Sequence, residues 1–464
     1  MTDLTGLTLA EAADLIRQRK LSPVELTDAC LARIDALQGT LNAFITVMGE
    51  DVRAEARAAE EEIAAGNYRG PLHGIPIGLK DIFDVAGVRT TAGSKIWEQH
   101  IAADDSAVTR RLREAGAVIV GKLNMHEWAF GATGASSHFG PARNPWDTER
   151  ITGGSSSGSG AAVAAGMCFA AMGTDTGGSI RIPASLCGIT GIKPTFGRVS
   201  RAGLVPLSWS LDHAGPLTRT VRDAALVLQA IAGADPDDPS TVDEPPTDYA
   251  AALEGEPALS GVRIGVVDLS SFREAEPVVA SGFNEACRVL GDLGAGLESV
   301  TIPYMEQIPG AVAAIMLPEA LAFHQKRLAE HGDDYQPDVR YRLELAATYP
   351  AVTHVQAQRL RELAVRAARD EVFPKYDLLV TPATRTFATP IETADFSRGL
   401  DLIQYTNPFN LLGTPAISIP CGFREDGLPL GLQIIGRWWA EAGVFRAAHA
   451  YEQATDWHTR RPPL

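Results

Sequence analysis

Cysteine is scarce in this sequence, and its five residues are scattered at positions 30, 168, 187, 287 and 421. No two of them form a CxxC pair, so neither a disulfide framework nor a cysteine-based zinc site is expected. The ten histidines are also dispersed, and no HExxH pattern occurs among them. The sequence therefore predicts that the protein binds no metal ion through a recognisable ligand cluster.

Positive charge is also in deficit, with 41 Lys and Arg against 57 Asp and Glu and a formal net charge of −16. A protein that binds nucleic acids or anionic membranes needs a basic face, so neither is expected as a partner. The most apolar run, Ala161–Gly173, is too short to span a bilayer. The N-terminal MTDLTGLTLAEAADL lacks a basic start followed by an apolar core, so we expect no signal peptide and a cytoplasmic protein.

What the sequence does contain is typical of a soluble globular protein, with 45% hydrophobic and 21% charged residues. A length of 464 residues fits about three domains of ordinary size or a single large α/β domain. The acidic, proline-rich stretch Ala234–Pro246 predicts an exposed connector. The sequence pattern of residues 303–370 is irregular and predicts mostly helix.

Local signals predict alternating helices and strands. Two capping-box patterns, Thr8 with Glu11 and Ser22 with Glu25, predict the starts of two helices. Further helices are expected at Asp51–Ala65 and Ser106–Ala115, and strands at Gly74–Asp81, Ala117–Val120, Gly261–Leu269, Tyr376–Thr381, Ala416–Pro420 and Leu430–Ile435. This alternation predicts an α/β fold with a mixed or parallel sheet and helices on its faces.

The most unusual stretch is ITGGSSSGSG at residues 151–160. A flexible linker is one interpretation, but the stretch runs directly into the apolar Ala161–Ala165. A phosphate-binding loop is another, but the Gly-Lys-Ser/Thr ending of a P-loop is absent. Gly154–Gly158 also satisfies G-x-S-x-G, with Ser156 at its centre, but the preceding segment is a polar loop rather than the buried strand that a nucleophile elbow requires.

A second glycine- and serine-rich segment, GTDTGGSIRIPA, occupies residues 173–184. The two glycines before Ser179 can present backbone N–H groups to a ligand, as an oxyanion hole requires. An ordinary tight turn before a helix is the alternative interpretation.

Together these segments resemble the core of the amidase signature family, and of its stand-alone bacterial amidases in particular. GGSSSGSGAAVAAG and GTDTGGSIRIPASLCGITGIKPT match the central pattern, HGIPIGLKD matches the strand with the catalytic lysine, and KLNMHEWAFG and GPARNPWD match the intervening loop. SLDHAGP, NPFN and PAISIPCG match downstream, so the resemblance covers nearly the whole chain. One departure is Ser157, which stands where the family usually has glycine.

The resemblance implies a Ser–cis-Ser–Lys triad, with Ser179 as nucleophile, Ser155 as the bridging serine after a cis peptide bond to Gly154, and Lys80 as base. A serine hydroxyl is a poor nucleophile near neutral pH and needs a positioned base. Lysine serves as that base only when neutral, and burial favours its neutral form. A hydroxyl between the two can relay the proton, since it both donates and accepts.

The resemblance also implies roles for neighbouring residues. The oxyanion hole corresponds to the backbone amides of Thr176, Gly177, Gly178 and Ser179, and the substrate contacts to Ala129, Phe130, Gly131 and Ser155. Asp175 and Arg181 correspond to a pair that holds the nucleophile loop. His126 and His213 lie near these motifs, and a structural role is expected for both because the mechanism needs no imidazole.

The function implied is an amidohydrolase that works through an acyl-enzyme on Ser179, without metal or organic cofactor, on small-molecule amides, esters or carbamates (a urethanase activity). A monomer or homodimer is expected. The alternative is the glutaminase A subunit of an aminoacyl-tRNA amidotransferase. That subunit has an RYDG-type segment, which Leu317–Glu330 lacks, and an acidic residue where this chain has Ile403.

The fold implied is a single large α/β domain whose central mixed sheet is covered by helices on both faces. Residues 1–70 would form an N-terminal helical segment packed on the core, and residues 71–464 the catalytic domain. Residues 303–370 would be a helical insertion that shapes the substrate site.

Overall fold

The computed structural model describes residues 3–245 and 247–464. Met1 and Thr2 of the predicted N-terminal segment, and Pro246 at the end of the predicted connector, lie outside the described residues. The helices are α1 Leu9–Arg17, α2 Pro23–Leu41, α3 Gly49–Ala64, α4 Ala107–Glu114, α5 Ser157–Ala164, α6 Arg181–Cys187, α7 Val221–Ile231, α8 Pro277–Asp292, α9 Ile308–His331, α10 Pro337–Ala346, α11 Ala351–Ala367, α12 Phe396–Ile403, α13 Asn407–Leu412 and α14 Glu441–Gln453.

Within the described residues, the strands form an 11-stranded central sheet and a separate 2-stranded hairpin. In spatial order the central strands are β1 Phe44–Val47, β3 Val118–Leu123, β2 Pro76–Lys80, β6 Ala170–Asp175, β8 His213–Thr218, β7 Thr190–Lys193, β12 Ala416–Phe423, β13 Pro429–Gly436, β11 Leu378–Pro382, β9 Arg263–Val267 and β10 Gly296–Val300. The hairpin consists of β4 Arg143–Asn144 and β5 Asp147–Ile151. Parallel and antiparallel pairs both occur, so the predicted mixed sheet is confirmed.

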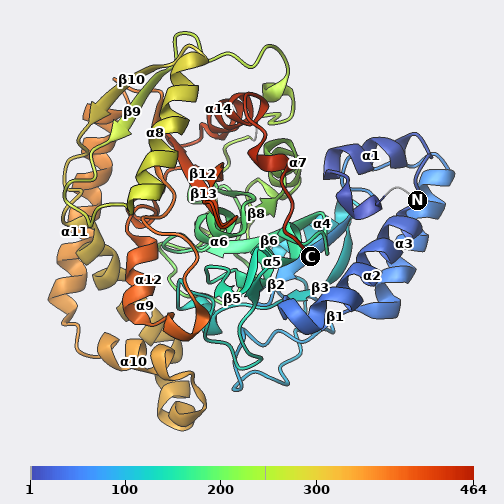
Figure 1. Cartoon of the computed structure of the whole chain (residues 1–464). Helices are drawn as coiled ribbons and strands as arrows, with labels where there is room; N and C mark the ends of the chain where they lie inside the picture. The colour runs from blue at the N-terminus through green and yellow to red at the C-terminus, as the bar shows by residue number, and fades with distance from the viewer. Residues whose placement is uncertain (1–2, 246) are drawn as a thin grey trace.

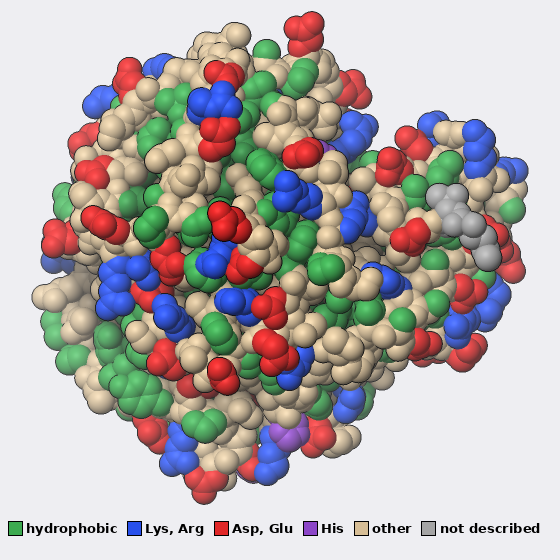
Figure 2. All heavy atoms as spheres, viewed as in Figure 1, with side chains coloured by type: hydrophobic (Ala, Val, Ile, Leu, Met, Phe, Trp, Pro, Cys, Tyr) green, Lys and Arg blue, Asp and Glu red, His purple; other side chains and the backbone are tan. Residues whose placement is uncertain are grey.

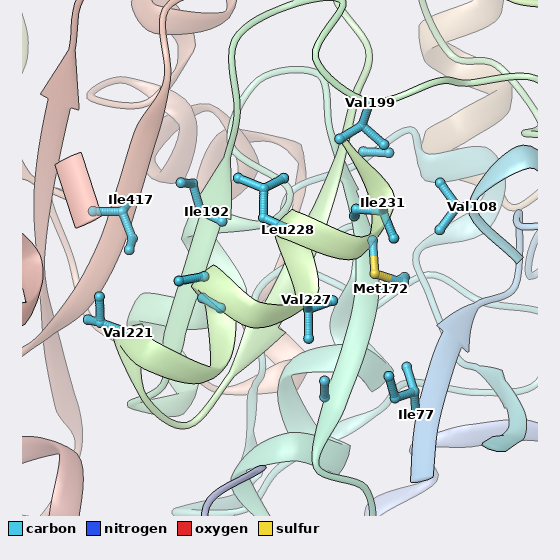
Figure 3. Packing of buried hydrophobic residues seen from close by; sticks show 14 of the residues in the cluster. Ile77, Val108, Met172, Ile192, Val199, Val221, Val227, Leu228, Ile231 and Ile417 are labelled. Carbon is cyan, nitrogen blue, oxygen red and sulfur yellow. The ribbon is translucent and has the colours of Figure 1, made fainter. Parts of the chain in front are cut away.

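Successive residues of the central strands face opposite layers, as the pleat of a strand requires. Ala170 and Met172 of β6 face the cluster that contains α7, whereas Ala171 between them faces the cluster that contains α5. Figure 3 shows α7 lying over the sheet, with Val227 and Leu228 near side chains from β2, β6, β7 and β12. The predicted coverage of the sheet by helices on both faces is confirmed.

Both predicted capping boxes are present at the starts of α1 and α2, and each satisfies backbone N–H groups that would otherwise lack partners. Residues 3–70 supply α1, α2 and α3, which lie together at one end of the molecule (Figure 1). The same segment also supplies β1, which the sequence analysis did not predict and which pairs antiparallel with β3 at the sheet edge. The N-terminal segment is therefore not purely helical.

Residues 303–370 contain α9, α10 and α11, which lie at the end of the molecule opposite α1–α3 (Figure 1). The predicted connector is mostly exposed, but Asp235 and Asp238 within it are buried. Asp235 accepts a hydrogen bond from Ser200 (2.6 Å), and Asp238 pairs with Arg201 (3.3 Å). The stretch is thus exposed along most of its length, but these two carboxylates attach it to the loop after β7.

Figure 2 shows one face of the molecule, on which acidic and basic side chains are interspersed rather than gathered into a patch of one sign. None of the helices within the described residues combines the length and apolar character needed to cross a bilayer.

Candidate active site

Lys80 is the last residue of β2 and is completely buried. Its Nζ donates hydrogen bonds to Oγ of Ser155 (2.7 Å) and to Oγ1 of Thr174 (2.8 Å). Burial lowers the pKa of Lys80 to about 7, while the carboxylates of Asp212 and Asp175 oppose the fall. A substantial fraction of the Lys80 amine is therefore neutral near neutral pH, which is the state that accepts a proton.

The neighbouring Asp81 points away from Lys80, as adjacent residues of a strand do. Its Oδ1 lies 2.9 Å from Nζ of Lys122, and its Oδ2 accepts a hydrogen bond from the N–H of Thr91 (2.9 Å). Both side chains of the Asp81–Lys122 ion pair are fully buried. The carboxylate of Asp81 therefore pairs with Lys122 rather than with its neighbour Lys80.

Ser155 lies in the loop that joins β5 to α5, and the peptide bond between Gly154 and Ser155 is cis. Gly154 is in close contact with the loop after β3: its N–H donates to the carbonyl of Ala132 (2.7 Å), and a Cβ there would lie 2.6 Å from N of Gly134. Only glycine fits such an approach. The close packing fixes the backbone that carries the Ser155 side chain to Lys80.

Ser156 and Ser157 are also buried but point elsewhere. Oγ of Ser156 accepts from the N–H of Thr174 and donates to its carbonyl (both 3.3 Å), so it joins the loop to β6. The backbone N–H of Ser156 donates to the carbonyl of Ser179 (3.4 Å), which holds the two serine segments side by side. Strand β5 belongs to the small hairpin, so a central strand does not lead to Ser156 as a nucleophile elbow would require.

Ser179 lies in the tight loop between β6 and α6, where the carboxylate of Asp175 organises the backbone. Oδ1 of Asp175 accepts from the N–H of Gly178 (2.8 Å), and Oδ2 accepts from the N–H of Ile180 (3.1 Å). Gly178 has φ +136°, and a Cβ at this position would lie 2.2 Å from Oγ1 of Thr406. The glycine is therefore required both by conformation and by space.

The four amides expected to form an oxyanion hole are not equivalent. The N–H of Gly178, one of the predicted donors, already donates to Oδ1 of Asp175 (2.8 Å) in this structure. The N–H groups of Gly177 and Ser179 have no backbone or side-chain partner within residues 3–245 and 247–464. Thr176, Gly177 and Ser179 all line the adjacent cavity.

Arg181 and Asp175 form a fully buried ion pair, with Nη2 of Arg181 2.8 Å from Oδ1 of Asp175. Burial alone would raise the pKa of Asp175, but the guanidinium of Arg181 and the ammonium of Lys193 hold it well below its usual range. Arg181 also donates to Oε1 of Gln433 (2.5 Å) and Oδ1 of Asn410 (2.6 Å). The pair predicted from the sequence is thus the centre of a larger network that anchors the loop of Ser179.

The cavity beside Ser179 has a volume of about 460 Å³. Ala129, Phe130 and Gly131 line it, as expected, whereas Ser155 does not and lies beneath its surface. Most of the remaining wall is apolar and comes from α9, α10 and α12 and the loop after β9: Phe272, Val312, Ala313, Met316, Leu317, Leu345, Phe396, Leu400 and Ile403.

Charged groups in this cavity have partners within the protein. Arg342 donates to Oδ2 of Asp338 (2.6 Å) and to the carbonyl of Phe130 (2.9 Å). Asp401 pairs with Arg273 (3.0 Å) and with Arg385 (3.2 Å). The wall therefore offers a ligand mostly apolar surface rather than a free charge.

Two polar groups at the site were not predicted from the sequence. Thr174 is the second hydrogen-bond partner of Lys80, and its position at the end of a buried strand was hidden because β6 was not predicted. Asn407 lines the cavity, and its buried Oδ1 has no hydrogen-bond partner among the described residues. The NPFN motif that contains it was noted, but nothing in the sequence alone singled out this side chain.

The two histidines near the motifs, His126 and His213, are buried, and each has a hydrogen-bond partner within the protein. Nε2 of His126 lies 3.1 Å from Oδ2 of Asp338, and Nδ1 of His213 lies 2.7 Å from the carbonyl of Leu211. Burial lowers the pKa of both imidazoles. In the part of the chain that the structure describes, no three His, Cys, Asp or Glu side chains come together as metal ligands would.

Comparison with known proteins places this geometry in a family. The family model described as Amidase matches residues 25–445. The chain is 42% identical to the A subunit of the glutamyl-tRNA(Gln) amidotransferase of Roseiflexus sp. (strain RS-1), over 100% of this chain and 99% of that protein. It is 43% identical to an amidase of Pseudomonas putida, again over 100% of this chain and 99% of the relative.

A solved structure, that of native peptide amidase from Stenotrophomonas maltophilia, superposes with a TM-score of 0.86 at 35% identity and covers 98% of each chain. The resemblance found from the sequence motifs is thus confirmed along the full length of the chain. The chain belongs to the amidase signature family and is a hydrolase of the amidase type, acting on carbon–nitrogen bonds.

Proposed function

We propose that this chain is a stand-alone amidohydrolase that forms an acyl-enzyme on Ser179, with Ser155 and Lys80 as the proton relay. One observation carries the proposal: a completely buried lysine, with a pKa lowered to about 7, donates directly to Ser155 at 2.7 Å. A neutral amine in such a position is a general base for a serine hydroxyl. The hydrogen bond between the backbones of Ser156 and Ser179 holds the two serine segments together, which supports a proton relay between Ser155 and Ser179.

In the proposed acylation, Oγ of Ser179 attacks the substrate carbonyl carbon and its proton passes to Oγ of Ser155, while the proton of Ser155 moves to Lys80. The ammonium then returns a proton through Ser155 to the substrate nitrogen as the C–N bond breaks. Water next attacks the carbonyl carbon of the ester and gives a proton to Lys80 through Ser155. The bond between that carbon and Oγ of Ser179 then breaks, the relay returns the proton to Oγ, and the acid is released. Lys80 ends each half-reaction neutral, so the protons balance.

The negative oxygen of the tetrahedral intermediate needs hydrogen-bond donors, each worth about 3 kcal/mol in comparable sites. We assign this role to the N–H groups of Gly177 and Ser179, which border the cavity and have no partner in the part of the chain that the structure describes. Thr176 precedes them in the same loop. Gly178 instead positions the loop through its bond to Asp175.

For the substrate, the apolar wall favours a neutral amide with a bulky apolar acyl group. Residues 303–370 act as the shaping insertion in this proposal, because α9 and α10 contribute Val312, Met316 and Leu345 to the wall. Asn407, whose buried Oδ1 has no hydrogen-bond partner among the described residues, is one polar group there that can accept a hydrogen bond from the substrate. Esters and carbamates pass through the same tetrahedral intermediate, so activity on both is part of the proposal.

The second candidate is the glutaminase subunit of an aminoacyl-tRNA amidotransferase, which the 42% identity to such a subunit over the full chain favours. Against it, glutamine carries both an ammonium and a carboxylate, and each would need a partner in the cavity. Arg342 and Asp401 are already paired, and Ile403 is apolar where the glutaminase has an acid. We therefore prefer the hydrolase.

The experiment is to purify the chain alone and assay ammonia or amine release from apolar primary amides, aryl amides, carbamates and glutamine. The proposal expects turnover of apolar amides without any partner protein, and little turnover of glutamine. Selective hydrolysis of glutamine, or activity that appears only with added amidotransferase subunits, would favour the second candidate.

A further inference from the structure

Helix α9 faces the substrate cavity along its first half only. The α9 residues that line the cavity all precede Pro318: Pro309, Val312, Ala313, Met316 and Leu317. Pro318 has no N–H to donate to the carbonyl of Ala314, four residues earlier. That carbonyl instead accepts a hydrogen bond from Nδ1 of His354 on α11 (3.1 Å). The proline therefore marks the end of the cavity-facing half of α9, and α11 supports the helix at this point.

Glu319 follows Pro318 directly and lies outside the cavity wall that the described residues form. Its carboxylate accepts hydrogen bonds from Oγ of Ser208 (2.5 Å), from Oγ of Ser210 (2.5 Å) and from the N–H of Ser210 (3.2 Å). All three donors come from one short turn between β7 and β8. Glu319 therefore attaches α9 to this turn.

The turn that contains Ser208 in its own right holds the loop of the nucleophile. The N–H of Ser208 donates to Oδ2 of Asp212 (3.0 Å), and its carbonyl accepts from the N–H of Asp212 (2.9 Å). Oδ1 of Asp212 accepts from Oγ1 of Thr176 (2.5 Å), at the start of the loop that carries Ser179. A continuous path of hydrogen bonds therefore runs from Glu319 to that loop.

Both elements that Glu319 joins also contribute to the substrate cavity. Leu317, two residues before Glu319, and Leu207, one residue before Ser208, line its wall. An acyl group in the cavity is thus bounded by α9, by this turn and by the loop of Ser179. The relative placement of these three elements decides where the carbonyl carbon lies with respect to Oγ of Ser179.

We propose that Glu319 is a positioning residue for acyl transfer, which fixes the acyl-binding half of α9 relative to the loop of Ser179. This inference rests on the proposed function, in which the acyl group packs against α9 and Ser179 attacks its carbonyl carbon. A misplacement of about 1 Å that arises far from the reacting atoms can lower the rate about a hundredfold. An acetyl group fills little of a cavity of about 460 Å³, so its placement depends less on α9 than that of a bulky acyl group.

The test measures kcat and KM of the purified protein for phenylacetamide and acetamide, which both release ammonia and differ only in the acyl group. Glu319→Ala removes the carboxylate, whereas Glu319→Gln retains an acceptor oxygen at the same reach. Ser210→Ala removes one donor from the other side of the contact. The matched control is Glu330→Ala, because Glu330 is an exposed residue of the same helix that lies 3.9 Å from Nζ of Lys326. The ratio of kcat for the two substrates is independent of the fraction of enzyme that is folded.

We expect Glu319→Ala to lower the phenylacetamide-to-acetamide ratio of kcat about tenfold or more while each KM stays within about twofold, as loss of orientation at the reacting carbon requires. Ser210→Ala should lower the ratio by a smaller factor, and adding it to Glu319→Ala should lower the ratio no further. Glu319→Gln should restore most of the ratio, and Glu330→Ala should match the wild type. If Glu319→Ala does not fold, Ser210→Ala decides through the same ratio.

An unchanged ratio in Glu319→Ala and Ser210→Ala, or an equal fall in Glu330→Ala, would overturn the positioning role alone. A higher KM for phenylacetamide at unchanged kcat would also overturn it, because Glu319 would then affect acyl binding rather than placement. Failure of the wild type on phenylacetamide and on the other apolar amides would overturn the proposed function itself.

Discussion

The ionisation of Lys80 should control the acid side of the pH–activity profile. Burial lowers the pKa of this lysine from 10.5 to about 7. At about 1.4 kcal/mol per pH unit, that difference corresponds to about 5 kcal/mol of penalty on the buried ammonium form. The active form is the neutral amine, so activity rises as pH increases through the pKa and falls below it.

The magnitude follows from the fraction of neutral Lys80, which is about one half at pH 7, about a tenth at pH 6 and about a hundredth at pH 5. We therefore expect kcat/KM for an apolar amide to fall about tenfold between pH 6 and pH 5. The assay is initial rate at substrate concentrations well below KM, from pH 5 to 9 at constant ionic strength. Enzyme returned from each pH to pH 7.5 should regain full activity, which separates titration from unfolding.

A second measurement identifies the titrating group. The carboxylate of Asp212 raises the pKa of Lys80, so Asp212→Asn should move the acid side of the profile to lower pH. The readout is the midpoint pH rather than the rate, so a partly misfolded variant still reports it. A kcat/KM that is constant from pH 5 to 8, or a midpoint that Asp212→Asn leaves in place, would refute the assignment of Lys80 as base.

Other predictions concern the nucleophile, the buried ion pair, the pH dependence of the free energy of unfolding, and the effect of metal chelators on activity. Ser179→Ala should abolish turnover while Ser156→Ala keeps most of it, and the reverse pattern in a steady-state assay would favour the nucleophile elbow. Arg181→Met should lower the free energy of unfolding, measured in urea, by about 3–5 kcal/mol, because it leaves Asp175 buried without its charge partner; an unchanged midpoint would contradict this. Because Lys80 titrates near 7 when folded and near 10.5 when unfolded, the unfolded chain binds more protons between these values, so the stability of the wild type relative to Lys80→Met should rise with pH across that window. Dialysis against EDTA should leave activity unchanged, because the proton relay and the loop amides supply the acid–base and charge-stabilising groups. Loss of activity that added zinc restores would contradict the metal-free mechanism.

The parts of the fold that the sequence predicted are those set by neighbours in the chain. Thr8 and Glu11 lie three residues apart, and their capping box forms as the pattern indicates. Lys80 was expected at the end of an apolar strand and is found there. Strands β6, β7 and β8 were not predicted, because glycine, proline and polar residues interrupt their apolar pattern. Those strands are formed by pairing with one another across the sheet.

The candidate site shows the same difference between features set by short sequence motifs and features set by contacts in the folded chain. The sequence motifs indicated Ser155, Ser179 and Lys80, and the structure brings Lys80 to Ser155. The network around Arg181 was underestimated because Asn410 and Gln433 join it from more than two hundred residues away. The hydrogen bond from the N–H of Gly178 to Asp175, three residues earlier, depends on the conformation of the loop, which the sequence pattern does not reveal. Such contacts depend on the packed loop rather than on spacing in the sequence.

The central claim is that Ser179 carries the acyl group, and mass spectrometry of the quenched enzyme tests it most directly. A slowly hydrolysed p-nitrophenyl ester of phenylacetic acid is mixed with the enzyme, the reaction is stopped in acid, and the protein is digested and sequenced. A phenylacetyl group is expected on Ser179 in the wild type, and no such adduct in Ser179→Ala. An adduct on Ser156, or turnover that leaves Ser179 unmodified at every time point, would contradict it.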